Sequence, residues 1–184
     1  MKNEVSQNRV TAHEMTYCAI SAAVMCILGP MSIPIGAVPV SFTNLVIYIS
    51  VFILGMKRTA ISYLIYLFIG AFGLPVFSGY TGGFAKFAGP TGGYLIGFIF
   101  MSLICGFFAE KFKNKLVIVF GMILATAVAY AFGTAWFVAI TESGWGYAFG
   151  ICVLPFIFGD IVKILISMLA GPAVERRLKK AEIS

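Results

Sequence analysis

Apolar residues occur in six long stretches, separated by short segments that are basic or rich in glycine and proline. A helix that crosses a bilayer needs about 20 mainly apolar residues, so six such helices with short connections occupy nearly all of the 184 residues. The pattern therefore predicts an all-α membrane protein with one domain, residues 1–184, and no room for a separate soluble domain. The six predicted membrane helices cover about residues 15–28, 41–56, 59–72 or 73, 93–109, 116–140 and 147–170.

Two of the connections are unusual for their composition and length. Residues 29–39 contain three prolines, which cannot continue a regular helix, and residues 74–92 form a far longer connection that is dense in glycine and aromatic residues. Long loops are usually functional or disordered. Disordered linkers are poor in aromatic residues, so we expect residues 74–92 to form an ordered cap over the helices.

The start of the last predicted helix is ambiguous. If this helix enters the membrane at Tyr147, Asp160 lies near the middle of the bilayer. If it enters at Pro155, Asp160 lies within about two helical turns of the surface. In both cases we expect the two loops described above to cover it.

The composition supports a membrane location. Hydrophobic residues make up 60% of the chain and charged residues 11%, whereas a soluble domain has about half apolar and about a quarter charged residues. The chain has 13 Lys and Arg against 7 Asp and Glu. Most of the basic residues flank the apolar stretches, as membrane orientation requires. We therefore do not expect a nucleic-acid partner.

The basic residues between the predicted helices indicate how the chain is oriented. Positive residues in short loops stay in the cytoplasm. Nearly all of them fall on one side, in the segments 2–9, 57–58, 111–115 and 176–180, and only Lys86 falls on the other side. This distribution predicts a multi-pass protein of the cell membrane with both termini in the cytoplasm and the two long loops outside.

Asp160 and Lys163 are the acidic and basic residues that lie inside a predicted membrane helix. A charge at the centre of a bilayer costs at least about 2.5–3.5 kcal/mol, and a separation of three residues places both side chains on one helix face. They can form a structural ion pair, or together bind a ligand that has hydrogen-bond donors and a negative group. Ionisable residues inside a membrane favour the second interpretation.

Other candidate site residues lie near the outer ends of the predicted helices. Thr43, Asn44 and Tyr94 can converge on the same cavity, although each is also suited to capping or to a contact between helices. Phe42 and Phe77 are suited to the walls of a small-molecule pocket and equally to anchoring at the membrane surface.

Several enzyme classes are excluded by the residues present. The sequence has no GxxxxGK[ST] phosphate-binding loop. The only histidine, His13, lies at the opposite edge of the membrane from Ser78, so a serine activated by a nearby base is not expected. One histidine and scattered cysteines do not make a zinc site. We therefore expect neither an enzyme nor a bound metal or cofactor.

Ala19 and Ala23 form a small-xxx-small pattern in the first predicted helix. Small residues at this spacing let another helix approach closely. The pattern alone does not distinguish an internal partner helix from another subunit.

Five sequence blocks resemble the BioY family of biotin-binding S components of energy-coupling factor (ECF) transporters. They are residues 33–34, 38–43 (VPVSFT), 73–79 (GLPVFSG), 89–94 (GPTGGY) and 159–163 (GDIVK). The GPTGGY block is the most specific, and the resemblance extends over nearly the whole chain.

The resemblance implies a six-helix bundle that captures biotin from outside and associates with a transmembrane coupling (T) protein and two ATPase subunits. It further implies that Asp160 and Lys163 bind biotin and that Ala19 and Ala23 dock on the coupling protein. We expect Thr43, Asn44 and Tyr94 to add hydrogen bonds, and Phe42, Phe77 and the glycine-rich backbone around Gly89 to close over the ligand as a lid.

Two other functions remain open from the sequence. The chain can be an S component or facilitator for another small vitamin, because the polarity of a pocket does not distinguish one heterocycle from another. It can also be a structural membrane subunit without a ligand, in which Asp160 and Lys163 only hold helices together.

Overall fold

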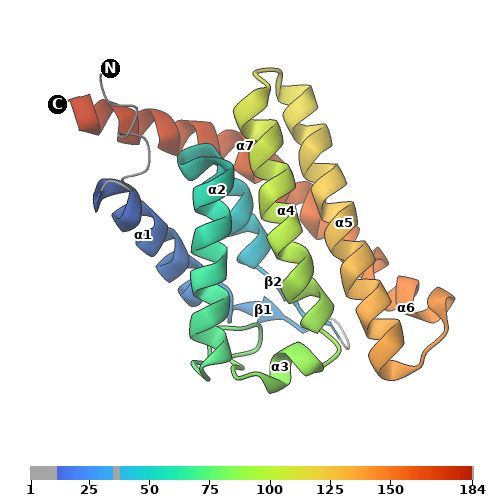
Figure 1. Ribbon diagram of the computed structural model, residues 1–184. Helices are drawn as coiled ribbons and strands as arrows, with labels where there is room; N and C mark the ends of the chain where they lie inside the picture. Colours follow the sequence, from blue (N-terminus) through green and yellow to red (C-terminus); the bar gives the residue numbers. More distant parts are fainter. Residues whose placement is uncertain (1–11, 35–37, 184) are drawn as a thin grey trace, which may run out of the picture.

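The computed structural model describes residues 12–34 and 38–183. Long helices run across the molecule, and two short strands and a short helix lie together at one end (Figure 1). In chain order the elements are α1 (Ala12–Leu28), β1 (Ser32–Ile33), β2 (Val40–Ser41), α2 (Thr43–Ala71), α3 (Ala85–Ala88), α4 (Gly92–Lys111), α5 (Lys115–Thr141), α6 (Trp145–Cys152) and α7 (Leu154–Ile183).

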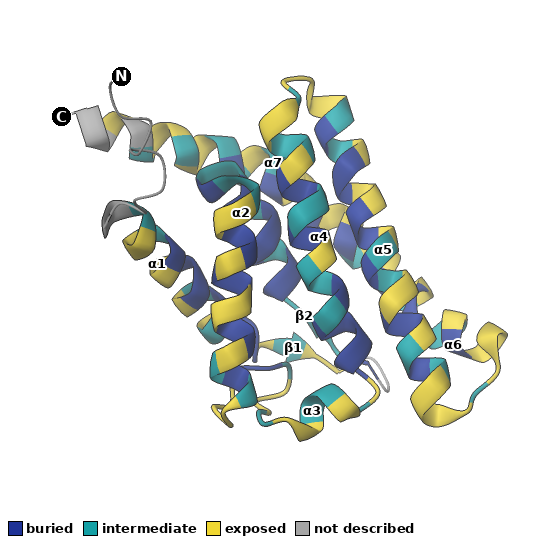
Figure 2. Cartoon of the chain, in the orientation of Figure 1, coloured by how far each residue is buried: buried dark blue, intermediate teal, exposed yellow. Residues whose placement is uncertain are grey.

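Four helical segments of the described residues are long and apolar enough to cross a membrane. They are Thr43–Ala71, Gly92–Lys111, Lys115–Thr141 and Trp145–Leu178. A fifth apolar helix, Glu14–Leu28, is shorter. Exposed large apolar side chains such as Phe120, Leu165 and Leu169 cover these helices. Figure 2 shows exposed and buried positions alternating along each long helix, which is the arrangement expected for a bundle surrounded by lipid.

Helix α2 consists of two helical segments joined across Gly55, whose φ of 74° and ψ of −172° are not helical. The chain reverses direction there (Figure 1). The sequence predicted a break at this place, but at Lys57 and Arg58 instead of Gly55. Glycine tolerates this backbone conformation, and the Glu110 carboxylate accepts a hydrogen bond from the Met56 N–H at 2.6 Å, which satisfies a free donor at the start of the second segment.

The last predicted helix, residues 147–170, has to be corrected at both ends. The structure divides it at Val153 into α6 and α7. Pro155 explains the division, because a proline has no N–H to donate to the carbonyl of Ile151. Helix α7 also continues past residue 170 to Ile183, through Pro172. Its last turns are rich in Glu, Arg, Lys, Leu and Ala, which favour a helix even in water.

Most of the core lies between α2, α4 and α5. A single cluster of buried side chains includes Tyr63, Phe77, Met101 and Met122. A smaller cluster joins the start of α4 to α6 through Tyr94 and Phe137, among others. Glycines allow close contact: a Cβ at Gly97 would lie 3.1 Å from Ala129 Cα on α5.

The two long connections pack together at one end of the bundle. The proline-rich segment carries an antiparallel pair of strands, β1 and β2, with Ser32 opposite Ser41 and Ile33 opposite Val40. The sequence did not predict these strands, because the segment is rich in proline. The connection between α2 and α4 contains α3 and an isolated bridge between Phe77 and Thr81. The Gly79 N–H donates to the Pro30 carbonyl at 3.1 Å. The longer connection thus packs against the proline-rich segment, and the Gly83 N–H donates to the Gly70 carbonyl near the end of α2.

Some predictions lie outside the described residues. These are the basic residues of segment 2–9 and residues 35–37 of the proline-rich loop.

Candidate functional site

A cavity lies beneath these connections, between the starts of α2, α4 and α7 and the middle of α5. Eleven of its lining residues are polar: Ser41, Thr43, Asn44, Tyr66, Ser78, Thr91, Tyr94, Thr126, Tyr130, Asp160 and Lys163. The apolar lining residues are Val38, Pro39, Leu95, Phe98, Met101, Ala129 and Phe156. Its volume of about 50 Å³ is well below the roughly 300–1,000 Å³ of most small-molecule sites, so a ligand larger than a few atoms has to widen it.

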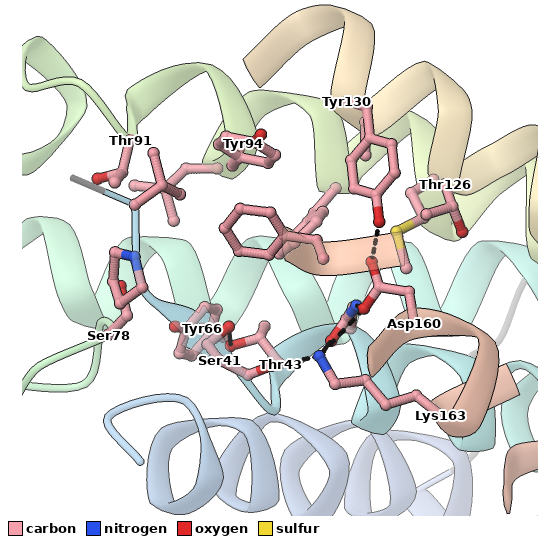
Figure 3. A pocket seen from close by; sticks show the side chains of 18 residues that line it. Ser41, Thr43, Tyr66, Ser78, Thr91, Tyr94, Thr126, Tyr130, Asp160 and Lys163 are labelled. Carbon is pink, nitrogen blue, oxygen red and sulfur yellow. Dashed lines mark hydrogen bonds and ion pairs between the residues drawn. The ribbon is translucent and has the colours of Figure 1, made fainter. Parts of the chain in front are cut away.

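Asp160 is the centre of a hydrogen-bond network in this cavity. Only 5% of the residue is exposed. Its Oδ1 accepts hydrogen bonds from Asn44 Nδ2 at 2.7 Å and from Lys163 Nζ at 3.1 Å. Its Oδ2 accepts one from the Tyr130 hydroxyl at 2.6 Å. Figure 3 shows the Tyr130 hydroxyl from α5 pointing at the carboxylate on α7. Because a carboxylate offers about four acceptor positions, Asp160 retains capacity for a ligand donor.

Lys163 uses all of its donors within the protein. Its Nζ lies 2.8 Å from the Ser41 carbonyl, 2.9 Å from Asn44 Oδ1 and 3.1 Å from Asp160 Oδ1. An ammonium group has three N–H donors. A ligand acceptor can therefore reach Lys163 only by replacing one of these three partners.

Asn44 allows two charges to be buried here. Its amide donates to Asp160 and its carbonyl oxygen accepts from Lys163, so it bridges the i,i+3 ion pair. Buried charges are tolerated when they are paired and their remaining hydrogen-bonding groups are satisfied. The cluster meets both conditions, and the charged pair can persist in a low-dielectric environment.

A second polar contact involves Thr126 of the cavity wall. The Tyr48 hydroxyl lies 2.5 Å from Thr126 Oγ1, and Thr126 also donates to the Met122 carbonyl at 2.7 Å. Tyr48 is fully buried. This contact ties the first segment of α2 to α5 directly below Asn44.

The structure brings five of the eight predicted site residues to the cavity: Thr43, Asn44, Tyr94, Asp160 and Lys163. The hydroxyl of Tyr94 donates to the Cys152 carbonyl, so this residue joins α4 to the end of α6. Thr43 Oγ1 accepts from the Ser41 hydroxyl at 3.3 Å.

The other three predicted residues do not line the cavity. Phe42 immediately precedes α2 and is half-buried. Phe77 is fully buried in the core, where its ring packs edge-on against Tyr66 and Phe87. The Gly89 carbonyl accepts a hydrogen bond from Trp136 Nε1 at 3.0 Å, which holds the end of α3 on α5. Among the lining residues, Phe98 and Phe156 provide phenyl rings instead.

Sequence reasoning missed several lining residues, and Tyr130 is the most important. A signal for it was present: Thr126 and Tyr130 are four residues apart, so they share one face of an otherwise apolar helix. Ser41, Ser78 and Thr91 lie outside the regular helices, where no helical period predicts a side chain's direction, and Tyr66 is a buried residue of the second segment of α2.

Ala19 and Ala23 are both exposed, whereas Ala22 and Met25 on the opposite face of α1 are buried. The small-residue pattern thus points away from the core of this chain, and no helix of the described residues packs on it. Among the described residues, no group of three or more His, Cys, Asp or Glu side chains forms a candidate metal site.

Comparison with known proteins decides the family. The sequence model of the BioY family matches residues 1–180. The chain belongs to the BioY family. It is 33% identical over 167 residues to the biotin transporter BioY2 of Lactococcus lactis subsp. cremoris, with 90% of this chain and 92% of that protein aligned. It is 34% identical over 177 residues to the biotin transporter BioY of Rhizobium etli, with 90% and 94% aligned.

A solved structure resembles the whole fold. The crystal structure of the S component for biotin from an ECF-type ABC transporter superposes with a TM-score of 0.81 at 30% sequence identity, covering 98% of this chain and 95% of that one. Together with the apolar helices, this likeness identifies a multi-pass membrane protein of the transporter class. Membership of the BioY family confirms the expectation that the chain is not an enzyme.

Proposed function

We propose that this chain is the biotin-capturing S component of an ECF-type transporter and that biotin binds in the cavity beside Asp160. The observation that carries the proposal is the buried Asn44–Asp160–Lys163 cluster in the wall of a cavity, in a chain of the BioY family. The relatives named biotin transporters cover nearly all of it.

The chemistry of biotin matches the lining residues. The ureido ring of biotin has two N–H donors and a carbonyl acceptor, its thiophane ring is apolar, and its valerate chain ends in a carboxylate. One ureido N–H group donates to the remaining acceptor position of Asp160, which gives a short charge-assisted hydrogen bond. Met101, Phe98 and Phe156 surround the apolar ring, and Thr43 and Tyr94 add polar contacts.

Lys163 takes part by exchanging a partner. When the ureido oxygen or the carboxylate enters, it replaces the Ser41 carbonyl or Asn44 Oδ1 as an acceptor for the ammonium. The number of hydrogen bonds to Lys163 then stays constant. This exchange keeps all three N–H donors of Lys163 paired both without and with the ligand.

The topology supports capture from outside. In the proposal the chain crosses the membrane six times, because α2 comprises two spans and α6 and α7 together form the last one. Basic residues cluster at one end of the bundle, in the segments 57–58, 111–115 and 176–180, which supports a cytoplasmic location for that end and for both termini. The cavity and the connection of residues 74–92 then face the exterior.

Transport needs partners that supply energy. We infer that the chain associates with a transmembrane coupling protein and two ATPase subunits, as the S-component likeness suggests. The exposed face at Ala19 and Ala23 suits docking of a coupling-protein helix.

Equilibrium binding of biotin to the purified chain in detergent tests the ligand and its site together. We expect tight binding that Asp160→Asn weakens about 10- to 100-fold, since hydrogen bonds to charged groups contribute about 1.5–3 kcal/mol. We expect Lys163→Met to weaken it further, because Asp160 is then buried without its counter-charge.

Glu142→Gln and Lys113→Met, which change exposed residues outside the cavity, serve as matched controls and should bind like the unmodified chain. Normal affinity in Asp160→Asn would show that the site is misplaced. Failure of the folded, unmodified chain to bind biotin would refute the proposal.

One observation favours a second candidate, a structural subunit without a ligand. All three donors of Lys163 are satisfied by protein groups, as they would be in a purely structural cluster. The same binding measurement discriminates, and a competition panel of other vitamins with heterocyclic rings tests the specificity.

A further inference from the structure

A second concave site, which shares no lining residue with the proposed biotin cavity, lies on the outside of the bundle. It is a groove of about 350 Å³ between α1, the first segment of α2 and the last turns of α7. Its lining includes Ile20, Val24 and Leu28 of α1, Ile49 of α2, and Val174 and Leu178 of α7.

The groove is apolar although two serines line it. Ser21 and Ser50 lie 2.8 Å apart and hydrogen-bond each other, and both are buried. Because the two serines are buried and bond each other, the groove offers a ligand almost no polar partner along its length. It therefore suits a hydrocarbon chain.

The length of the groove matches one leaflet of a bilayer. It follows α1 from Tyr17 to Leu28, which at 1.5 Å per residue is about 16 Å. Half of a hydrocarbon core of about 30 Å is about 15 Å. A single acyl chain lying along α1 would fill this distance.

One end of the groove is basic. It finishes at Tyr17, Leu54 and Leu178, beside the start of the second segment of α2 and the end of α7. Exposed at this end are Lys57, Arg176, Arg177 and Lys180, whereas Arg58 is already paired with Glu14. A juxtamembrane cluster of this kind attracts anionic lipid headgroups.

We propose that this groove binds an anionic phospholipid, with one acyl chain along α1 and the phosphate beside Lys57 and Arg177. The arrangement joins the end of α7 to α1 through a lipid. It also places a bound lipid next to the exposed face of Ala19 and Ala23, so lipid composition would influence the surface offered to a partner.

Lipid retention by the full-length chain tests the proposal. The chain is reconstituted in vesicles of equimolar dioleoyl phosphatidylglycerol and dioleoyl phosphatidylcholine and extracted in mild detergent. The phospholipids that co-purify are then counted by mass spectrometry. We expect about one phosphatidylglycerol per chain, enriched at least tenfold over phosphatidylcholine.

Two variants separate the charge from the groove. Lys57→Gln/Arg177→Gln should reduce the enrichment to less than twofold. Its control, Lys111→Gln/Lys113→Gln, removes as many charges from the α4–α5 connection and should keep the enrichment. Val24→Trp fills the groove and should abolish retention, whereas Leu124→Trp on the exposed face of α5 should not.

Helix content, gel filtration and biotin binding show that each variant is folded. Equal retention of the two lipids by the unmodified chain would overturn the proposal, and so would an equal loss in the two charge variants. If Val24→Trp retained phosphatidylglycerol but no longer bound the coupling protein, the groove would be a protein-docking surface and the lipid proposal would be wrong.

Discussion

At the scale of single residues, the site depends on a neutral amide and a phenol as much as on the two charges. Asn44 bridges Asp160 and Lys163, and Tyr130 holds the other carboxylate oxygen. The charged pair stands out in the sequence because charge inside an apolar helix is costly. Its neutral partners do not stand out, because a tyrosine or an asparagine in a membrane helix has many structural uses.

Tyr130→Phe should weaken biotin binding by about tenfold, with little effect on folding. The substitution keeps the ring and removes the hydroxyl that fixes the plane of the Asp160 carboxylate, and hydrogen bonds to charged groups contribute about 1.5–3 kcal/mol. Tyr63→Phe is the control, since that hydroxyl donates to the Leu95 carbonyl and does not contact Asp160. Titration of both variants with biotin decides: unchanged affinity in Tyr130→Phe would mean that the ligand displaces this hydroxyl.

At the scale of elements, glycine and proline determine where the apolar helices end. Gly55 reverses α2, and Pro155 separates α6 from α7. The apolar pattern located the helices well, because burial in lipid depends on the average hydrophobicity over about 20 residues. It located the bend at Lys57 and Arg58 instead of Gly55, because the bend depends on one backbone conformation and on the Glu110 carboxylate that supports it.

Gly55→Ala should lower the stability of the fold by roughly 1–3 kcal/mol. Its φ and ψ lie in a region that is essentially restricted to glycine, and an added Cβ would collide with Glu110. Gly150→Ala is the control: a Cβ there meets nothing within 4 Å, and alanine favours the helix. The measurement is thermal unfolding in detergent, and equal midpoints for the two variants would contradict the expected strain.

The connection of residues 74–92 should act as a lid. Ser78 and Thr91 line the cavity from this segment, and the cavity has to widen for biotin, so ligand contacts should stabilise the closed arrangement. We expect slower amide hydrogen exchange in residues 74–92 when biotin is present, with no comparable change in the α4–α5 connection. Identical exchange with and without biotin would count against a lid.

At the scale of the whole molecule, the bundle presents two separate surfaces, which we propose serve ligand capture and assembly with partners. The polar cavity lies under the loops at one end, and the small-residue face of α1 is exposed on the side. Because the two regions share no residues, ligand capture and assembly with partners can be tested independently.

Ala19→Leu/Ala23→Leu should prevent assembly with the coupling and ATPase subunits and leave biotin affinity unchanged. The larger side chains would keep a partner helix from approaching closely. Ala131→Leu/Ala135→Leu has the same spacing on an exposed face of α5 and serves as the control. Co-purification of the tagged complex is the measurement, and normal assembly of the α1 variant would exclude this face as the docking surface.

The sequence alone determined the membrane class, the approximate places of the apolar helices and the presence of the charged pair Asp160 and Lys163 within one of them. These follow from the cost of moving each residue type into lipid, which depends on local composition. Only the tertiary structure decided that Asn44 and Tyr130 meet Asp160, that Phe98 and Phe156 line the cavity, and that Phe77 and Gly89 do not. Those facts depend on how each helix is rotated and packed against its neighbours, and hydrophobicity along a single chain does not encode that rotation.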